Sequence, residues 1–335
     1  MVLIVVHIGA GHYSKKNLPS YMMLIQGALL KGIQTYSSQS NSTQKNLSAA
    51  TAVMGVLESS GLVNSGCGSA LNRDLHIETD AIMMDGSTGA LGVVSSAPGI
   101  SNPSDIAYSL LCESILGLEY GYLIRPCILC GPSIRQYAEE RGLLKSVAIP
   151  QKRREEGEKY LHMIKRKHET DVYDTVGCIV LNETDIVAAG SSGGNWMSIP
   201  GRSGLCSIPG AGIWCDSKCA CISSGIGESC IRRLFAKGVC DLMKTENDHE
   251  VEVERILVDD LESDMNRMNI TLDPSFGVIV VNKDEILEMI VSHSSEMFGY
   301  GYIYMNDSEL SDENRIRKNV FVKISTKEVS KNVYS

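Results

Sequence analysis

The sequence lacks any apolar run of the length that a membrane-spanning helix needs, which is roughly 18–20 residues. Its apolar N-terminus, residues 1–11, has no positive flank and no cleavage site, so we expect a buried first strand rather than a signal peptide. Of the 335 residues, 43% are hydrophobic and 21% are charged, which is typical of a soluble globular protein with one large domain or two ordinary ones. We therefore expect no membrane partner.

The sequence also lacks an excess of positive charge. The first 174 residues carry 16 basic and 16 acidic residues, whereas the rest carries 15 basic and 24 acidic ones, so the net charge of −9 arises entirely after residue 174. A protein that binds nucleic acid usually shows the opposite sign. We therefore expect no nucleic-acid partner.

A second pair of cysteines with the spacing of a zinc finger is missing as well. The eleven cysteines are an odd number in a long chain, which favours reduced thiols in a cytosolic or nuclear protein over a disulfide framework. Two groups nevertheless leave zinc open as an alternative: Cys127 with Cys130, and Cys215, Cys219, Cys221 and Cys230. Because Cys127 and Cys130 flank a short apolar segment, we favour core packing and expect no metal or other cofactor.

Strand-like and helix-like segments alternate along the chain. Before residue 146, the apolar pattern predicts strands at 3–7, 77–84, 90–95 and 124–130 and helices at 21–36, 43–57, 103–116 and 133–141. After residue 174, it predicts strands at 176–181, 186–191, 277–281, 286–292 and 299–304, a strand-rich stretch at 206–221, helices at 228–243 and 252–268, and an acidic loop at 306–314. This arrangement indicates an α/β (α+β) fold of two sheets packed face to face with helices outside.

The segment at 146–174 separates these two parts. It is dense in charge and buries too little apolar surface to pack as core, so it is either a mobile linker or an exposed helix. Its basic clusters, Lys152–Arg154 and Lys165–Lys167, are spaced as in a bipartite nuclear import signal. A solvated charged helix explains the same residues equally well.

Thr175 begins the first apolar run after this segment and directly follows Asp174. Taken alone, it is an ordinary β-branched strand residue. If the bond between the two residues were cut, the freed α-amine of Thr175, whose unperturbed pKa is roughly 7.7–8.0, could accept the proton of its hydroxyl. The position is therefore a candidate for a nucleophile that is made by cleavage.

Loops rich in glycine and serine follow Thr175. Small residues at 191–194 and 200–204 let a substrate backbone approach closely, and Arg202 among them has the planar guanidinium that suits a carboxylate. The loop at 223–228 runs into a helix and can direct backbone N–H groups at a developing oxyanion. The alternatives are a surface arginine in a flexible loop and a helix cap with Glu228 in the first turn.

Several of these segments occur together, in this order, in a known family. Over about residues 2–305, the chain is similar to the N-terminal nucleophile hydrolases of the type 2 asparaginase family, and within it most resembles the threonine aspartases. The motifs that carry the resemblance are His7–Gly11, Asn64–Ser69, Leu71-Asn72, Asp80-Ala81, Met84–Gly86, Asp174–Gly177, Ser192–Gly194, Pro200–Arg202, Gly225–Glu228 and Ser292–Ser294.

The resemblance implies a four-layer αββα sandwich that forms one domain. Its precursor would cleave itself between Asp174 and Thr175 into an α chain, residues 1–174, and a β chain, residues 175–335. The two chains would stay together as a heterodimer, and two heterodimers could pair. The charged segment at 146–174 matches the threonine aspartases better than it matches the shorter linkers of plain asparaginases.

The resemblance also implies roles for single residues. The expected catalytic residues are Thr175, Ser192, Ser224 and Gly225, and the expected substrate-binding residues are Arg202, Gly9 and Lys16. Thr175 would be the nucleophile, with the Ser192 hydroxyl beside it. Ser224 and Gly225 would form the oxyanion hole, and Arg202 would bind the substrate carboxylate. Ungapped counting places Asn17 where the threonine aspartases have a substrate-binding lysine, and a shift of one residue places Lys16 there.

Leu205 marks a departure from the plain asparaginases, which have an aspartate at the corresponding position that binds the α-amine of a free amino acid. An ammonium group facing leucine would be buried without a partner, which is costly, so Leu205 favours an aspartate inside a polypeptide. We therefore expect a threonine endopeptidase that cuts protein substrates at Asp-Gly bonds.

The resemblance implies transcription or chromatin regulators as substrates and a location in nucleus and cytoplasm. The alternatives are an asparaginase or isoaspartyl peptidase acting on small amides, and an unprocessed interaction scaffold.

Overall fold

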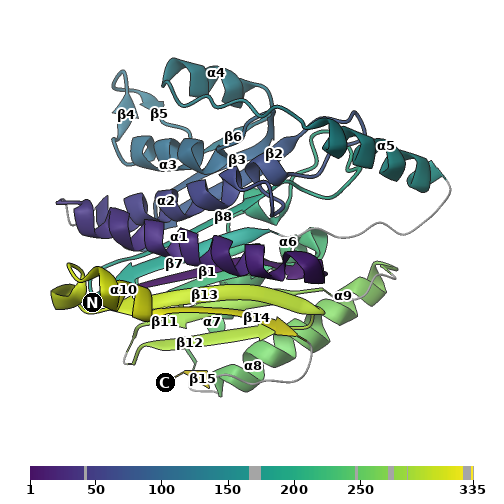
Figure 1. The fold of residues 1–335 in the computed structure, drawn as a ribbon. Coiled ribbons are helices and arrows are strands. Elements are labelled where there is room, and N and C mark those ends of the chain that lie inside the picture. Colours follow the sequence, from purple (N-terminus) through teal and green to yellow (C-terminus); the bar gives the residue numbers. More distant parts are fainter. Residues whose placement is uncertain are drawn as a thin grey trace.

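The N-terminal strand β1 (Val2–Gly11) is buried along its whole length, as its run of apolar and small residues predicts. It pairs antiparallel with β13 (Met297–Met305) on one side and with β7 (Val176–Asn182) on the other. The computed structural model describes residues 1–40, 44–165, 175–245, 248–270, 275–284, 286–326 and 333–334. The N-terminal strand β1 thus lies between a strand from the middle of the chain and one from its C-terminal part (Figure 1).

Two β-sheets form the centre of the molecule. The larger sheet runs in the order β14-β13-β1-β7-β8-β2-β3-β6, and the smaller sheet runs β15-β12-β11-β10-β9. The remaining strands of the larger sheet are β2 (Glu78–Asp85), β3 (Leu91–Pro98), β6 (Ile128–Cys130), β8 (Ile186–Ser192) and β14 (Val320–Thr326). The strands of the smaller sheet are β9 (Ile213–Cys215), β10 (Cys219–Ser224), β11 (Gly277–Asn282), β12 (Glu288–His293) and β15 (Val333–Tyr334).

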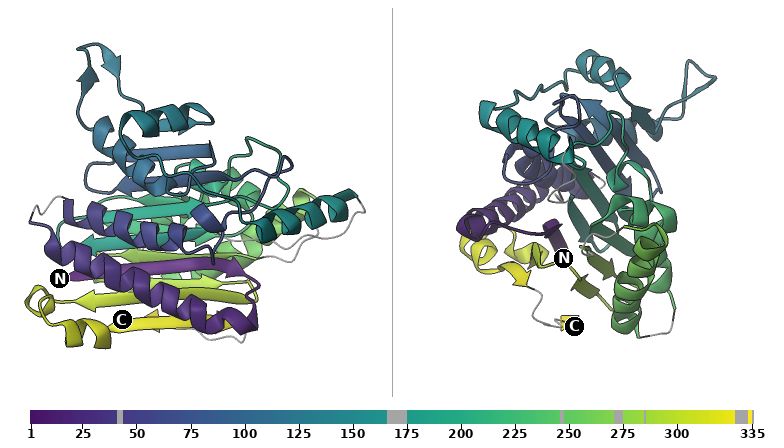
Figure 2. Two further views of the ribbon diagram at one scale, coloured as in Figure 1. Left: turned by 45° about the horizontal axis from the view of Figure 1, so that its top comes forward. Right: turned by 90° about the vertical axis from the view of Figure 1, so that its right-hand side faces the viewer.

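Helices cover the outer face of each sheet, which gives four layers (Figure 2). The larger sheet carries α1 (Leu18–Ser38), α2 (Lys45–Ser59), α3 (Pro103–Ser114) and α4 (Ser133–Glu140). The smaller sheet carries α7 (Phe235–Leu242), α8 (His249–Arg255) and α9 (Leu261–Arg267). The predicted four-layer αββα sandwich is therefore confirmed.

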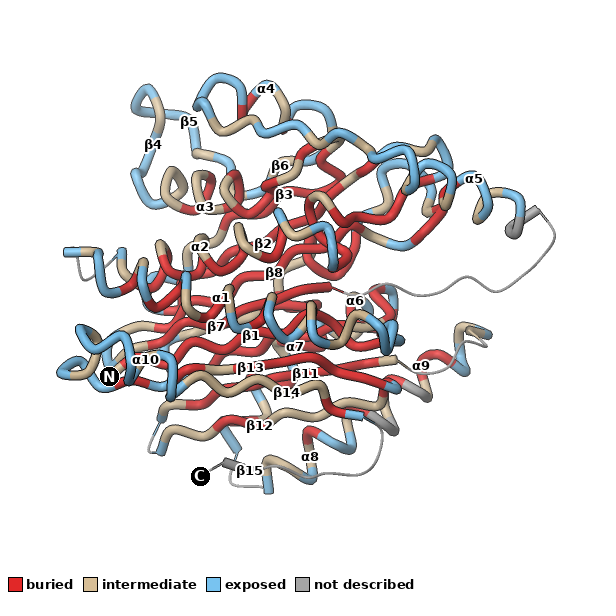
Figure 3. Tube along the Cα trace, viewed as in Figure 1, coloured by how far each residue is buried: buried red, intermediate tan, exposed pale blue. Residues whose placement is uncertain are grey.

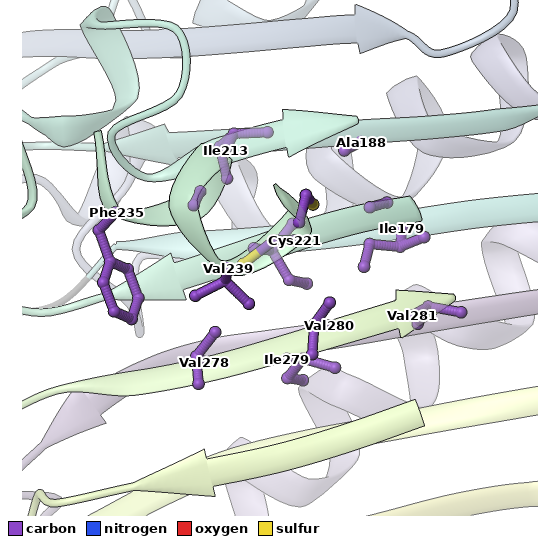
Figure 4. Packing of buried hydrophobic residues seen from close by; sticks show 14 of the residues in the cluster. Ile179, Ala188, Ile213, Cys221, Phe235, Val239, Val278, Ile279, Val280 and Val281 are labelled. Atoms are coloured by element: carbon purple, nitrogen blue, oxygen red, sulfur yellow. The ribbon is translucent and has the colours of Figure 1, made fainter. Parts of the chain in front are cut away.

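Consecutive residues of the central strands are buried, as Figure 3 shows, so both faces of these strands are covered. In β7, Val176, Cys178 and Val180 face the core under α1 and α2, whereas Ile179 and Leu181 belong to the core that includes the smaller sheet. A strand that is buried on both faces needs a continuous apolar run instead of an alternating pattern. Figure 4 shows labelled side chains from both sheets and from α7 in one packed cluster.

Three local predictions were wrong. Of the strand predicted at 124–130, only Ile128–Cys130 forms a strand, β6, and the segment is not buried. It begins in an exposed hairpin of β4 (Leu118–Glu119) and β5 (Leu123–Ile124), Ile124 is 87% exposed, and Cys130 is exposed as well. The helix predicted at 228–243 is divided into α6 (Gly227–Arg233) and α7 by Leu234, whose φ of +48° is incompatible with a continuous right-handed helix. The acidic loop predicted at 306–314 contains a short helix, η6 (Asp307–Glu309), and the first turn of a second helix, α10 (Glu313–Lys318).

The charged segment forms a helix over part of its length, α5 (Gln151–Lys165). One face of α5 packs on the protein: Tyr160 stacks on Trp196 with ring centroids 4.7 Å apart, and Gly157 approaches Leu71 and Leu75. Arg166 and Lys167 of the second basic cluster, and Asp174, lie outside the described residues. No helix within the described part of the chain is long and apolar enough to cross a membrane.

Candidate active site

The start of β7 places Thr175 next to Ser192. Val176 pairs with Ser191 of β8, and because the strands are antiparallel, the next positions along the register are Thr175 and Ser192. Thr175 is 3% exposed and Ser192 is 5% exposed. A Cβ on Gly177, two residues after Thr175, would lie 3.2 Å from Cβ of Ile222 in the smaller sheet. Since side chains two apart share a face of a strand, Thr175 faces the space between the sheets.

The end of β10 brings Ser224 and Gly225 to the same end of the sandwich. The Ser224 hydroxyl accepts a hydrogen bond from the backbone N–H of Ala10 at 3.0 Å and so ties the smaller sheet to β1. Gly225 has a φ of +151°, and a Cβ there would lie 2.3 Å from Cδ1 of Phe276. Only glycine fits this turn, which leaves its backbone without a side chain to shield it.

Arg202 lies across the start of α6. Its guanidinium makes a forked ion pair with Glu228: Nε and Nη2 donate to Oε1 at 3.1 and 2.9 Å, and Nη2 donates to Oε2 at 3.0 Å. A Cβ on Gly204 or Gly227 would come within 3.0 Å of the guanidinium nitrogens. These two glycines therefore make the room that the guanidinium occupies.

Asp80 holds the loop that carries Arg202. Its carboxylate is 3% exposed and accepts backbone N–H groups from Ser96 at 2.8 Å and from Gly204 at 2.7 Å. Burial raises the pKa of Asp80, and these hydrogen bonds and the charge of Arg202 oppose that rise. The sequence pattern marked Asp80 only as part of a shared motif, because a polar residue in a buried strand does not reveal which loop it contacts.

Cys206 is a neighbour of Thr175 that the sequence did not reveal. Burial raises the pKa of its thiol well above the usual value, and a hydrogen bond with the Thr175 side chain opposes that rise. Its sulfur would lie 3.0 Å from a Cβ on Gly190, which pairs with Gly177 of β7. A neutral thiol in this position packs against the Thr175 hydroxyl and is unsuited to remove its proton.

The remaining predicted site residues occupy different positions. Gly9 lies in the bulge of β1, with a φ of +109°, and its carbonyl accepts a hydrogen bond from the Tyr13 hydroxyl. Lys16 is exposed on the short helix η1 (Lys15–Asn17), and its side chain makes no hydrogen bond or ion pair with another described residue. The structure therefore brings Gly9 near Ser224 through Ala10, whereas Lys16 has no such contact.

All eleven cysteines are free thiols. Seven of them are buried, but Cys130 is exposed and Cys127 is half-buried, so the expectation of core packing was wrong for this pair. Among the residues that the structure describes, no three His, Cys, Asp or Glu side chains are grouped so that they could hold a metal ion.

Glu58 at the end of α2 is a buried acid close to β8. It is 1% exposed, and its Oε1 accepts hydrogen bonds from the N–H of Ser104 at 3.1 Å and from the Ser104 hydroxyl at 2.6 Å. Burial raises the pKa of Glu58 to about 8, and hydrogen bonds from Ser104 and Ser191 oppose the rise. Ser191 directly precedes Ser192, so this acid borders the strand end that carries the site.

The raised pKa of Glu58 predicts a dependence of stability on pH. Between its ordinary value of 4.5 and about 8, the folded protein keeps the proton that the unfolded chain has lost. The free energy of unfolding therefore falls as pH rises through this window, by roughly 1 kcal/mol per pH unit. His7 acts in the opposite sense below pH 6.5, because burial lowers its pKa to about 3.

Comparison with Glu58→Gln isolates this contribution, since the amide keeps the shape and cannot ionise. Urea unfolding of both proteins from pH 5 to 9 gives the free energy of unfolding of wild type minus that of Glu58→Gln. This difference should fall as pH rises to about 8 and then level off. If the free energies of unfolding of the two proteins instead change with pH in parallel, Glu58 is ionised in the folded protein.

The chain matches a family model and several known proteins over most of its length. A family model described as asparaginase matches residues 1–116 and 133–308. The chain is 28% identical over 263 residues to a plant-type L-asparaginase of Pyrobaculum calidifontis, covering 76% of this chain and 84% of the relative. It is 26% identical over 290 residues to an isoaspartyl peptidase/L-asparaginase of Xenopus laevis, covering 84% and 85%. It is 28% identical over 256 residues to an isoaspartyl peptidase of Escherichia coli, covering 72% and 76%. The exposed β4–β5 hairpin lies in the stretch that the family match omits.

Proposed function

The chain belongs to the asparaginase family of N-terminal nucleophile hydrolases, and on that premise we propose that it cleaves its own bond between Asp174 and Thr175 and then hydrolyses amide bonds at aspartyl carbonyl groups. The observation that carries the proposal is the position of Thr175 at the start of β7. It is buried beside Ser192 and faces the space between the sheets. Cleavage would convert this strand start into a free α-amine on the residue that bears the hydroxyl.

The α-amine is the base that suits Thr175. Cys206 has a thiol whose pKa is raised by burial, and His7 already accepts the N–H of Gly9 at Nδ1 and is held neutral by burial, which lowers its pKa to about 3. An α-amine titrates near neutrality and reaches the hydroxyl of its own residue. In the proposed reaction, it takes the proton while Oγ attacks the carbonyl. Backbone N–H groups at Gly225 stabilise the oxyanion. As the C–N bond breaks, the α-ammonium gives the proton to the leaving amine, and water then hydrolyses the acyl-enzyme to the free acid and the Thr175 hydroxyl.

Arg202 is the proposed partner of the substrate carboxylate. Its guanidinium is 18% exposed at the side chain, and the turn that carries it is fixed by Asp80 through Gly204. A planar guanidinium held in one orientation binds a carboxylate through two parallel hydrogen bonds. This arrangement would direct an aspartyl side chain to Arg202 and present its neighbouring carbonyl to Thr175.

Leu205 supports a peptide substrate with an internal aspartate. It is 3% exposed, and its side chain fills the space over Gly212, where a Cβ would come within 1.9 Å of it. The plain asparaginases, which this chain resembles, have an aspartate here that binds a free α-amine. A buried leucine offers such an amine no partner. We therefore propose an endopeptidase that cuts after aspartate, with Asp-Gly bonds preferred because glycine enters a crowded cleft most easily.

The names of the relatives favour a second candidate, an asparaginase or isoaspartyl peptidase that acts on small amides. The nucleophile, its base and Arg202 would serve both activities, so only the substrate distinguishes them. The test uses matured protein with L-asparagine, a β-aspartyl dipeptide and a blocked peptide with one internal Asp-Gly bond. The endopeptidase predicts the highest kcat/KM on the blocked peptide. A higher kcat/KM on either small amide would establish the second candidate instead.

Leu205→Asp should move the preference toward substrates with a free amine. The new carboxylate would pair with the ammonium group, and we expect kcat/KM for asparagine to rise roughly 10–100-fold relative to Leu205→Asn, which has the same shape without the charge. Ammonia release measures the effect, and thermal unfolding shows that both variants fold. Equal rates in the two variants would mean that this position does not face the substrate.

Nuclear import is a separate part of the proposal. Lys152 and Arg154 of the first basic cluster are exposed on α5, which suits recognition by an acidic receptor groove.

The same proposal includes association of residues 1–174 and 175–335 after cleavage, because β1 pairs with both β7 and β13 across the cleavage point.

A further inference from the structure

The guanidinium of Arg202 is already occupied before any substrate arrives. The forked pair with Glu228 uses Nε and Nη2, the edge that offers two parallel hydrogen bonds to a carboxylate. A substrate carboxylate that binds in this way needs the position now held by Glu228. Arg202 cannot serve both through the same edge.

A second carboxylate lies on the other side of Arg202. A Cβ on Gly204 would lie 3.0 Å from Arg202 Nη1 and 2.8 Å from Asp80 Oδ2, and the charge of Arg202 acts on the pKa of Asp80. One cation therefore faces two acidic side chains. A third carboxylate from the substrate would have to overcome their combined repulsion unless one of them moves away.

The surroundings of the two carboxylates show which one can move. Asp80 is 3% exposed and is fixed by two backbone N–H groups. Glu228 is 51% exposed at its side chain, and the hydrogen bonds recorded for its carboxylate come from Arg202. Water can replace these bonds when Glu228 swings out, at the small cost typical of a half-exposed ion pair.

Glu228 is also close in sequence to the proposed oxyanion donor, Gly225. It lies three residues after Gly225, in the first turn of α6, and Gly227 between them packs against the Arg202 guanidinium. The proposed oxyanion donor and the partner of Arg202 thus belong to one short loop and helix start. Release of Glu228 frees the carboxylate site without disturbing the buried support from Asp80.

We propose that Glu228 is an internal competitor for Arg202, which holds the guanidinium in its binding orientation in the empty enzyme and yields it to the carboxylate of the substrate. This inference rests on the proposed function of Arg202. The competition lowers the apparent affinity for every acidic ligand by the fraction of molecules in which Arg202 is free. Glu228 thereby sets the affinity of the site, whereas Arg202 and Thr175 set what is bound and cut.

The test measures binding and turnover separately on matured protein. The binding probe is N-acetyl-L-aspartate, followed by calorimetry, and the turnover probe is the blocked Asp-Gly peptide. Glu228→Gln should lower both the Kd of the probe and the KM of the peptide about fivefold, with kcat unchanged, because the neutral amide competes weakly for the guanidinium. Glu228→Asp, whose shorter side chain reaches Arg202 less well, should fall between wild type and Glu228→Gln.

Glu252→Gln is the matched control. Glu252 pairs with Arg255 on α8, away from Arg202, so its loss should change neither Kd nor KM. An unchanged or higher Kd in Glu228→Gln would overturn the proposal and make Glu228 a support for Arg202. Absence of probe binding to wild type and variant alike would overturn it too. If the probe binds as expected but the peptide is not cut, the proposed peptidase activity fails while the competition stands.

Discussion

Thr175→Ala is expected to remain a single full-length chain and to lose peptide hydrolysis by about 10⁴-fold or more in kcat. The reason is that the same hydroxyl is the proposed nucleophile for both reactions, and the register of β7 and β8 leaves no other side chain in its place beside Ser192. Thr175→Ser keeps a hydroxyl and should retain part of both activities. Gel analysis after long incubation reports the self-cleavage, and peptide turnover reports the catalysis.

Thr184→Ala provides the control for this variant. Thr184 is exposed in the turn between β7 and β8, where its hydroxyl contacts the Asn182 side chain. Its replacement should leave cleavage and turnover at wild-type levels. Fragments from Thr175→Ala that end at the same position as those of wild type would refute the nucleophile assignment.

Arg202→Ala is expected to lower kcat/KM for peptides with an internal aspartate by about 10²–10³-fold, mainly through a higher KM. The substrate carboxylate would lose its partner and would face Glu228 and Asp80 without the intervening cation. Arg202→Lys restores the charge but not the fork, so it should recover only a minor part of the activity. Steady-state kinetics on the blocked Asp-Gly peptide measures all three proteins.

The matched control is Arg232→Ala, which removes an exposed arginine from the same helix, α6, that carries Glu228. It should leave kcat/KM unchanged. If Arg202→Ala cuts after aspartate as well as wild type does, Arg202 does not recognise the substrate, and the role proposed for Glu228 falls with it.

Much of the fold was predictable because the central strands are buried on both faces. The continuous apolar runs in β1, β7 and β11 marked them as strands. Every residue of these three strands is buried in the structure except Asn182, the last residue of β7. The segment at 124–130 was misjudged for the same reason. Its apolar residues resemble those of a buried strand, and only the tertiary structure shows that nothing among the described residues covers Ile124.

The candidate site was predictable only where the motif itself carries the geometry. Gly225 could be expected because glycine allows a loop to direct backbone N–H groups at an oxyanion, and its φ of +151° is one that glycine adopts readily. The contacts of Asp80 with Gly204, of Ser224 with Ala10 and of Cys206 with Thr175 join residues that are far apart in the sequence or lie on different strands. Neither spacing nor composition encodes such contacts. They follow from the register of the strands and the packing of the two sheets.

Intact-mass measurement of the purified wild-type protein tests the central claim most directly. The account predicts two masses, one for residues 1–174 and one for residues 175–335 with a free α-amine on Thr175, which add up to the full chain plus one water. A single mass near 36.4 kDa that persists after long incubation would contradict it, because Thr175 would then lack the free α-amine that is the proposed base for its hydroxyl.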